Sequence, residues 1–420
     1  MSDDKRSDGG ATVDTAPGSK GGGNVVDWLL ENKSRESVVA LATVASVLLL
    51  PMFLIDILGL LGEIVGVELG GFPALATQIL VFGTVAVGFN ILLGYTGLLS
   101  FGHAAMFGTG AFGAALFSNA VSSSPVLVVL TAVLVGTLVS WPIGFLSIRR
   151  SGVYFAVLTL TFGQMLYFFA FGPGSGIIEA GGTIFTNGDD GYTPYTGFEL
   201  TPELFGAIPL DQPVPILTPL LPGGGVSLKY LFVGAFAVLA VVFAHRIMKS
   251  PYGLILKALG ENEQRVRFVG LNAARYKLMA FILSGAFAGL GGGLFAMYKA
   301  GLTVHPNQTL FWTVSGDFVI MTTLGGVGTL FGPLIGAGVF EYIRLVVSGI
   351  AVAGIEFAEL WPLVLGLVFV LVVAFFSNGL YGGIRRGFRR VGNRLRAAPP
   401  EADAEADTEP RPARDGGGDD

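Results

Sequence analysis

Residues able to do acid–base, nucleophilic or metal chemistry are few in this 420-residue chain and stand at no catalytic spacing. The chain has no Cys, which excludes thiol catalysis, disulfides and Cys-ligated metal sites. Its three His, far apart in the sequence, are His103, His245 and His305. It carries no Walker nucleotide-binding loop, no H-E-x-x-H motif and no G-x-S-x-G motif. We therefore expect no catalytic residue, no metal site and no cofactor.

One segment, Gly108–Gly113, formally fits the G-x-G-x-x-G pattern of dinucleotide sites. It lies inside an apolar segment, with no predicted strand before it and no acidic partner after it. Small residues let helix backbones approach closely in a membrane, and that explains the glycines better. The same interpretation applies to Gly285, Gly289 and Gly293, which are spaced four residues apart.

Four ionisable residues fall within apolar segments, where charge is costly and a functional role is the first hypothesis: His103, Asp317, Glu341 and Arg344. His103 either makes a structural hydrogen bond or belongs to a solute pathway. Glu341 and Arg344 are three residues apart on one predicted helix, so they can form an ion pair, which we favour as structural. Asp317 lies near the end of a predicted span, where it can reach water.

One charged segment, 248–276, lies between apolar segments. Its stretch from Ala258 to Val269 predicts a short amphipathic helix, with Gly270 as the residue that ends it. Acids stand near the start of this helix and bases further along, as the helix dipole favours. The segment either docks a cytoplasmic partner or merely follows the positive-inside rule.

The composition predicts that most of the chain lies in a membrane. Hydrophobic residues make up 52% of it and charged residues 13%, against about 25% charged in soluble domains. Residues 69–148 are 80 consecutive positions without Asp, Glu, Lys or Arg, enough for three passes of about 20 residues. These features exclude a soluble enzyme and a nucleic-acid-binding protein.

The predicted fold is an all-α polytopic membrane protein with ten transmembrane helices. Beyond the three spans within 69–148, the others lie at roughly 37–58, 152–172, 227–247, 277–298, 313–328, 330–352 and 360–378. With both termini in the cytoplasm, the cytoplasmic segments, together with Arg246 and Lys277 at their margins, hold 22 of the 25 Lys and Arg. The outer segment 173–226 then carries six acids and no base.

Five motifs in order resemble the permease subunits of branched-chain amino-acid ABC importers, of the LivM type. The resemblance covers about residues 35–380, and its motifs are Gly94–Ala104, Tyr154–Leu160, Ser250–Gly253, Ala258–Gly270 and Leu324–Pro333. In that family the segment 258–270 is a coupling helix that fits a groove on the ATPase subunit. The residues matched to this coupling role are Ala258, Glu261, Asn262, Glu263, Arg265 and Gly270. The chain departs from the family pattern at Gly260, where a basic residue is common, and at Val266, where Ala is common.

The resemblance also supplies candidates for the solute route. Candidates for the translocation path are Gly94, Gly97, Ser100, Gly102, His103, Gly325 and Gly326. The segment Thr186–Gly191 resembles an outer turn of the family. The candidates for the outer mouth that it contains are Asn187, Asp189 and Asp190, although a plain turn explains them equally well.

The function implied is that of a non-catalytic membrane subunit of an ATP-driven importer for branched-chain amino acids, located in the cell membrane. The partners implied are two cytoplasmic ABC ATPases, a second homologous permease and an extracytoplasmic substrate-binding protein. A urea or short-chain amide permease of the same family is an alternative, and an ATP-independent secondary transporter or channel is a more distant one.

The chain is expected to divide into three parts. Residues 1–36, which lack a signal-peptide pattern, form a disordered cytoplasmic segment. Residues 37–380 form the permease domain, with the outer loop 173–226 and the cytoplasmic coupling loop 248–276. Residues 381–420 form a disordered cytoplasmic tail, first basic and then acidic.

Overall fold

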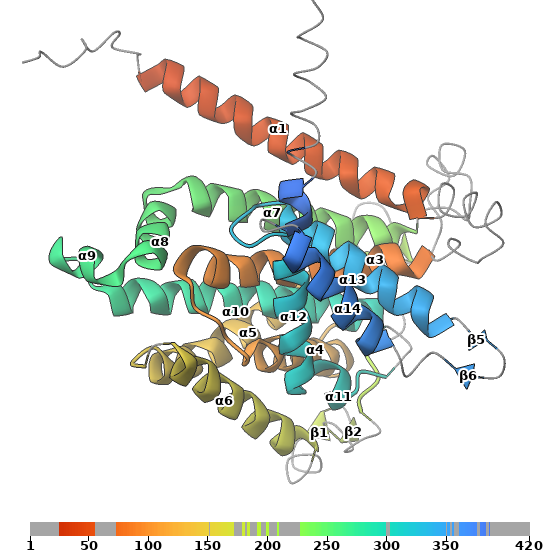
Figure 1. The fold of residues 1–420 in the computed structure, drawn as a ribbon. Coiled ribbons are helices and arrows are strands. Elements are labelled where there is room, and N and C mark those ends of the chain that lie inside the picture. The colour runs from red at the N-terminus through yellow and green to blue at the C-terminus, as the bar shows by residue number, and fades with distance from the viewer. Residues whose placement is uncertain are drawn as a thin grey trace, which may run out of the picture.

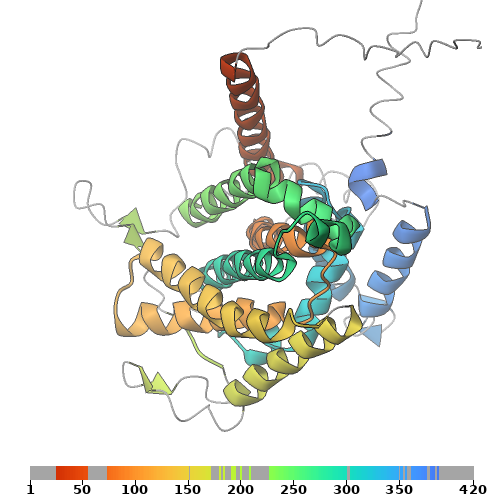
Figure 2. The same ribbon diagram turned by 90° about the vertical axis from the view of Figure 1, so that its left-hand side faces the viewer.

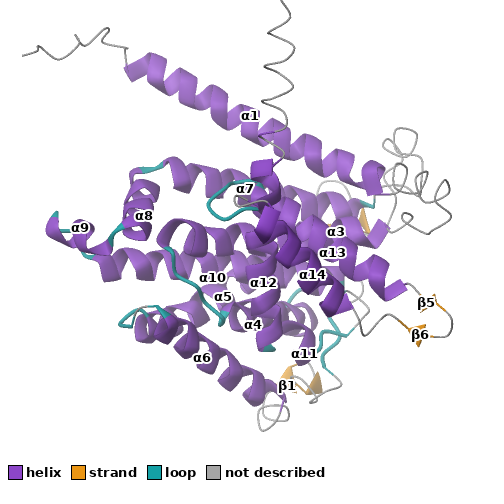
Figure 3. Cartoon of the chain, viewed as in Figure 1, coloured by secondary structure: helices purple, strands orange, loops and turns teal. Residues whose placement is uncertain are grey.

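The structure, a computed structural model, describes residues 25–54, 73–150, 152–171, 227–299, 303–349 and 361–375. It also describes short pieces at 179–180, 183–184, 191–194, 199–200, 208–209, 351–352, 355–356, 379–383 and 386. The described part is a bundle of helices with three two-stranded hairpins between them (Figure 3). Of the expected terminal segments 1–36 and 381–420, residues 1–24 and 387–420 lie outside the described residues, and a helix begins at Val25.

A helix overlaps each of the ten ranges predicted as spans. These helices are α1 (Val25–Met52), α3 (Pro73–Asn90, continued by the π-helix η2, Ile91–Tyr95), α4 (His103–Ala120), α5 (Pro125–Ser147), α6 (Val153–Phe171), α7 (Leu228–Lys249), α10 (Ala273–Tyr298), α12 (Trp312–Gly325), α13 (Gly332–Gly349) and α14 (Trp361–Phe375). Three shorter helices are α8 (Pro251–Glu261), α9 (Glu263–Phe268) and α11 (Pro306–Thr309). The prediction of a helical fold is therefore confirmed.

Six segments among the described residues are long and apolar enough to cross a membrane. They are α3 with η2, α5, α6, α7, α10 and the segment Pro362–Gly383, which begins in α14. Part of α1, Val38–Pro51, is a shorter apolar helix. Large apolar side chains such as Leu138, Phe168 and Leu239 are about 60% exposed, which a protein surrounded by water would rarely tolerate over so wide a surface.

Helices α3 and α10 lie at the centre of the bundle (Figures 1 and 2). Helix α10 packs against α5, α4 and α3, while α3 also packs against α13 and α7. Phenylalanine rings fill the space between them, with Phe107 and Phe295 5.4 Å apart and Phe107 and Phe318 5.6 Å apart, centroid to centroid. Edge and tilted arrangements of this kind stabilise a core beyond simple burial.

Glycines set the spacing of α4, α5 and α10. A Cβ atom placed at Gly289 of α10 would lie 2.5 Å from the carbonyl oxygen of Ala132 in α5, and one at Gly110 of α4 would lie 2.8 Å from the Cα of Gly289. Gly110 belongs to the formal G-x-G-x-x-G segment. The glycines here therefore permit close helix packing, as the sequence indicates.

The hairpins lie in the connections between helices. They pair β1 (Glu179–Ala180) with β2 (Thr183–Ile184), β3 (Glu199–Leu200) with β4 (Ile208–Pro209), and β5 (Ala351–Val352) with β6 (Ile355–Glu356), each antiparallel. The segment 173–226 is also joined to the connection after α10. Tyr192 and Val304 exchange two backbone hydrogen bonds, of 3.0 and 2.9 Å.

Candidate functional site

Helices α8 and α9 project from one end of the bundle between α7 and α10 (Figure 1). The sequence predicts a single helix over 258–269, and the structure corrects this prediction. The chain breaks at Asn262, whose backbone is extended, and starts a new helix there. The Asn262 side chain accepts a hydrogen bond of 3.1 Å from the backbone N–H of Arg265, so it is an N-cap inside the predicted helix. We call this end of the bundle, marked by α8 and α9, the α8 end.

The end of α9 follows the prediction. Gly270 has a φ of 85°, a left-handed conformation that glycine adopts without strain. Its N–H donates to the carbonyl of Arg267 at 2.9 Å, and Leu271 N–H donates to Val266 at 3.3 Å. This is the hydrogen-bonding pattern of a glycine-terminated helix.

Ion pairs fix α9 to the start of α10. The Glu263 carboxylate accepts hydrogen bonds of 2.6 Å from both Arg267 and Lys277. Partial burial acts to raise the pKa of the Glu263 carboxyl, but the hydrogen bonds from Lys277 and Arg267 outweigh it and hold the pKa below its usual value. Glu263, which is predicted to act in coupling, therefore also holds α9 against the start of α10.

The tip of α9 presents apolar side chains to the outside. Phe268 is 90% exposed and Val269 80% exposed; we call these two residues the α9 tip. Ala258, Glu261, Asn262 and Arg265 are exposed on the same pair of short helices. Two adjacent exposed apolar residues beside charged ones form a surface suited to contact with another protein. Phe268 was not predicted from the sequence, although its place two residues before the helix-ending Gly270 is a signal that could have found it.

Helix α8 also touches the Gly94–Gly97 turn. A Cβ atom at Gly260 would lie 2.5 Å from the carbonyl oxygen of Tyr95, and one at Gly97 would lie 4.0 Å from the Cα of Gly260. Gly97 itself has a φ of 69°. Any larger residue at position 260, including the basic residue common in the family, would push α8 away from this turn.

Asn90 joins the turn at Gly94 to the connection between α12 and α13. Its buried side chain donates to the carbonyl of Thr329 and accepts from the N–H of Gly328, each at 2.8 Å. A Cβ atom at Gly94 would lie 2.6 Å from the Gly328 nitrogen. Asn90 was missed by sequence reasoning, although an Asn within an apolar span is a signal that could have found it.

The segment that leads into α4 packs on α6. Phe101 N–H donates to the Thr159 hydroxyl at 3.2 Å, and a Cβ atom at Gly102 would lie 2.5 Å from the Thr159 carbonyl oxygen. Ser100 is fully buried and accepts from the N–H of Gly102 at 3.3 Å. Two motifs that carry the resemblance, Gly94–Ala104 and Tyr154–Leu160, thus meet in space.

His103 is fully buried at the start of α4. Its Nε2 lies 2.7 Å from the Ser284 hydroxyl, which donates its proton to the Gly88 carbonyl at 2.8 Å. The hydroxyl must then accept from Nε2–H, so Nε2 of His103 carries a proton. The rings of Phe89 and Phe281 lie against the imidazole, with centroids 4.7 and 5.8 Å away. Of the two roles considered for His103, this geometry supports the structural hydrogen bond.

The glycines among the path candidates therefore lie where the backbones of different helices and turns come close together. Gly325 and Gly326 lie near Gly94 along the chain that leads to Gly328, because a Cβ atom at Gly94 would lie 2.6 Å from the Gly328 nitrogen. The mouth candidates Asn187, Asp189 and Asp190 lie outside the described residues.

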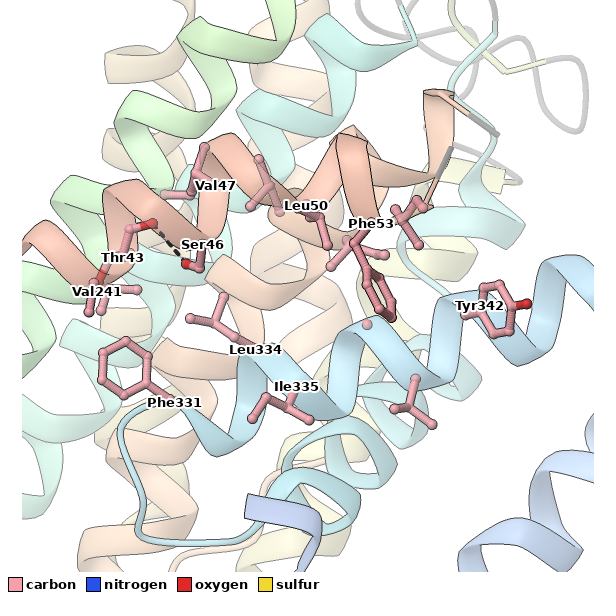
Figure 4. Close-up of a pocket in the computed structure, with 17 residues that line it drawn as sticks. Thr43, Ser46, Val47, Leu50, Phe53, Val241, Phe331, Leu334, Ile335 and Tyr342 are labelled. Atoms are coloured by element: carbon pink, nitrogen blue, oxygen red, sulfur yellow. Dashed lines mark hydrogen bonds between the residues drawn. The ribbon is translucent and has the colours of Figure 1, made fainter. Parts of the chain in front are cut away.

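A groove of about 660 Å³ runs between α1 and α13, with α3 and α7 behind it (Figure 4). Leu50 of α1 and Phe53, just after its end, face Leu334 and Ile335 of α13 across it. Its lining is mostly apolar, and the polar side chains in it are Thr43, Ser46 and Tyr342. It contains none of the residues predicted for coupling, the translocation path or the outer mouth. The lining therefore offers no charged side chain with which to hold a hydrophilic solute.

Comparisons with known proteins agree with the resemblance. A family model described as branched-chain amino acid transport system / permease component matches residues 71–373. The high-affinity branched-chain amino acid transport system permease protein LivM of Salmonella typhimurium strain LT2 is 28% identical over 326 residues, 74% of this chain and 70% of the relative. The protein of the same name from Escherichia coli strain K12 is 27% identical over the same shares.

A more partial match is the autoinducer 2 import system permease protein LsrC of Salmonella typhimurium strain LT2. It is 31% identical over 159 residues, 36% of this chain and 43% of the relative. No solved structure matches the chain.

Proposed function

The chain belongs to the family of branched-chain amino acid transport system permease components, and we propose that it is the membrane subunit of an ATP-driven importer for branched-chain amino acids. Its relatives over about three quarters of the chain are LivM permeases of high-affinity branched-chain amino acid transport systems. The partial match to LsrC marks a wider group of import permeases but covers too little of the chain to indicate another substrate.

One observation carries the proposed coupling to ATP. The apolar α9 tip is exposed, while α8 behind it contacts the Gly94–Gly97 turn through Gly260. A partner that displaces α8 and α9 would therefore also displace the end of α3. From there Asn90 carries the displacement to the connection between α12 and α13.

The proposed partners are those that the family resemblance implies. Two cytoplasmic ATPases supply the energy, and one of them docks on α8 and α9 of this chain. A second homologous permease completes the membrane part, and a substrate-binding protein delivers the amino acid from outside. ATP-driven closure of the ATPases moves α8 and α9 and switches the spans between outward-facing and inward-facing states.

The proposed placement in the cell membrane has ten spans, with both termini and the α8 end in the cytoplasm. The segment 173–226 then lies outside, where the binding protein docks. Its residues Asn187, Asp189 and Asp190 are our candidates for the outer mouth. Two observations support this placement. A helix overlaps each of the ten predicted ranges. Tyr192, in the segment 173–226, pairs with Val304 in the connection after α10, and the placement puts both of them on the outer side.

The test is uptake of radiolabelled L-leucine into proteoliposomes that contain the assembled importer and its binding protein. Uptake should require ATP on the ATPase side, and an excess of unlabelled L-isoleucine should suppress it while urea leaves it unchanged. Uptake by this chain alone, without the ATPases, would contradict the proposal and favour a secondary transporter or channel. Suppression by urea would instead favour the urea or short-chain amide alternative.

The matched variant is Glu261→Lys, which reverses an exposed charge on α8. It should reduce ATP-dependent uptake while the variant chain keeps the thermal stability of the wild type. Normal uptake in this variant would remove Glu261 from the docking surface.

A further inference from the structure

The groove between α1 and α13 is a feature that the proposed function does not use. Its volume of about 660 Å³ lies within the range of pockets that hold small molecules. Helices α1 and α13 form its two walls, and α3 and α7 form its floor (Figure 4). The groove is therefore large enough to be a binding site, and its walls decide what it binds.

Each wall of the groove is fixed to the floor. The Tyr230 hydroxyl of α7 donates a hydrogen bond to the Val47 carbonyl of α1, and a Cβ atom at Gly234 of α7 would lie 2.6 Å from Val47 Cγ1. On the other side, a Cβ atom at Gly83 of α3 would lie 2.7 Å from Leu334 Cδ2 of α13. Because α1 is held on α7 and α13 on α3, the space between them stays open for another molecule.

Two of the polar side chains in the lining are occupied by the backbone of their own helix. The Thr43 hydroxyl donates to the Val39 carbonyl at 2.7 Å, and the Ser46 hydroxyl donates to the Thr43 carbonyl at 2.8 Å. Their donors are therefore already used along most of the α1 wall. The groove offers its occupant hydrocarbon surface and close packing, which suits an apolar ligand.

The surroundings of the groove supply such a ligand. Leu41, Leu49 and Phe53, along the α1 side of the groove, are exposed large apolar residues, and the proposed placement puts this surface in the hydrocarbon of the bilayer. Association there depends on van der Waals packing, because lipid tails are as apolar as the side chains. An acyl chain in the groove contacts protein on three sides, whereas one on a flat helix face contacts protein on one side. The groove should therefore hold a chain longer than the rest of the surface does.

The length of the groove matches one acyl chain. On α13 its lining runs from Phe331 to Tyr342, a distance of about 16 Å at the helical rise per residue. The hydrocarbon of one leaflet is about 15 Å thick, half of the bilayer core. The groove thus has the length of a single lipid tail that lies along the helices.

The position of the groove indicates the leaflet. Phe331 ends the connection between α12 and α13, which Asn90 joins to the turn at the α8 end. Beyond Tyr342, α13 continues to Gly349, about 10 Å further. The groove therefore begins at the α8 end and stops short of the opposite end of α13.

We propose that this groove binds one acyl chain of a membrane phospholipid, which enters from the leaflet at the α8 end. The carboxyl end of the chain lies beside Thr43 and Phe331, and its methyl end lies beside Phe53 and Tyr342. This inference rests on the membrane placement proposed above and uses neither the substrate nor the ATPases.

The experiment is photo-cross-linking of the full-length chain in phosphatidylcholine nanodiscs. Two probes are used separately, phosphatidylcholine with a diazirine near the carboxyl end of one acyl chain and phosphatidylcholine with a diazirine near the methyl end. Mass spectrometry identifies the labelled residues. Leu134 and Leu138, 58% and 60% exposed on α5, report ordinary contact with lipid.

Each probe should label its own end of the groove. The carboxyl-end probe should label Thr43 and Phe331, and the methyl-end probe Phe53 and Tyr342, in each case at least about tenfold more than the α5 positions. Labelling of the groove no stronger than that of α5 would overturn the proposal, because it would show ordinary lipid contact only. The reverse order of the two probes would also overturn it. This comparison needs no variant, so it stands even if a substitution harms folding.

A variant that fills the groove tests the assignment further. Gly338 of α13 is part of the lining, and a Cβ atom there would make an ordinary contact of 3.7 Å with Ile79 Cγ2. Gly338→Leu should therefore lower the labelling of the groove at least about tenfold. Gly366→Leu is the matched control, because a Cβ atom at Gly366 of α14 would meet open space; its labelling should equal that of the wild type. Wild-type labelling in Gly338→Leu would contradict the site.

Two further outcomes separate this inference from its alternatives. Loss of groove labelling when a second permease joins the chain would overturn the proposal and make the groove an interface between permeases. Absence of groove labelling in a chain that shows ATP-dependent uptake of leucine would refute the lipid site and leave the importer intact. Groove labelling in a chain whose uptake needs no ATPase would refute the importer and leave the lipid site.

Discussion

The α8 end and the surroundings of the buried Glu341 carboxylate are held together by different interactions. At the α8 end, glycine backbones and neutral side chains such as Asn90 make short, satisfied contacts between distant loops. Around Glu341 of α13, polar and charged side chains make the contacts: the carboxylate accepts a 2.7 Å hydrogen bond from Gln78 of α3, and the Arg344 Nη1 atom lies 3.8 Å from its other oxygen. A closely packed neutral junction suits the transfer of a displacement, whereas a buried carboxylate depends on its partners to offset the cost of its burial.

The largest expected effect is at Glu341. Replacing Glu341 by Ala should lower the free energy of unfolding by about 3 kcal/mol, because Gln78 and Arg344 lose their partner inside the bundle. Denaturant titration of the purified chain in micelles measures the change. Glu341→Gln, which keeps a hydrogen-bonding oxygen, should cost less. An Ala variant as stable as the wild type would mean that water already satisfies these groups.

The next effect is on the neutral junction at the α8 end. Asn90→Ala should cost about 2 kcal/mol, because the Gly328 N–H and the Thr329 carbonyl are left without their partner. Asn119→Ala is the matched control, since Asn119 makes one exposed hydrogen bond to the Thr193 carbonyl. That control should stay within about 0.5 kcal/mol of the wild type. Equal losses of unfolding free energy in the two variants would contradict the stabilising role of the two Asn90 hydrogen bonds.

A third prediction separates docking from stability. Phe268→Asp should weaken binding of the ATPase at least tenfold, about 1.4 kcal/mol, and leave the free energy of unfolding unchanged, because the side chain is 90% exposed. Val121→Asp, at a position 70% exposed on the opposite end of α4, is the control. Pull-down of the ATPase by immobilised full-length variants measures the affinity. Unaltered binding by Phe268→Asp would place docking elsewhere.

The smallest effect is a dependence of stability on pH. The pKa of Glu263 is held below its usual value. Its ion pairs therefore stabilise the fold at pH values above the usual glutamate pKa, and this stability is lost as the pH falls through the lowered pKa. The contribution should be about 0.5 kcal/mol, since Arg267 is largely exposed. Melting temperatures of the wild type and Glu263→Gln should differ at neutral pH and converge in acid. A constant difference would contradict the ion-pair account.

The helices were predictable because hydropathy and chain length report directly on membrane spans. The end of α9 at Gly270 was also predictable from the sequence, because a glycine that follows a helix commonly ends it. The break at Asn262 was missed, although Asn is a strong N-cap residue, because amphipathic spacing over 258–269 favoured one continuous helix.

Contacts between distant segments were the harder part. The hydrogen bond of Gln78 with Glu341 joins residues 263 positions apart, and no local pattern in a single sequence indicates such a pairing. The pairing of Glu341 with Arg344 was predicted from helical spacing, but its loose geometry was not. The path candidates were chosen from motifs, whereas their tight packing became visible only in three dimensions.

The central claim is that the α9 tip docks an ATPase, and the absence of cysteine from the chain allows a direct test. A single Phe268→Cys substitution places one thiol at the tip, and Val121→Cys places one at the control position. The measurement is the rate of thiol labelling with and without the ATPases. The account predicts at least tenfold protection of position 268 and none of position 121. Equal labelling of position 268 in both conditions would contradict it.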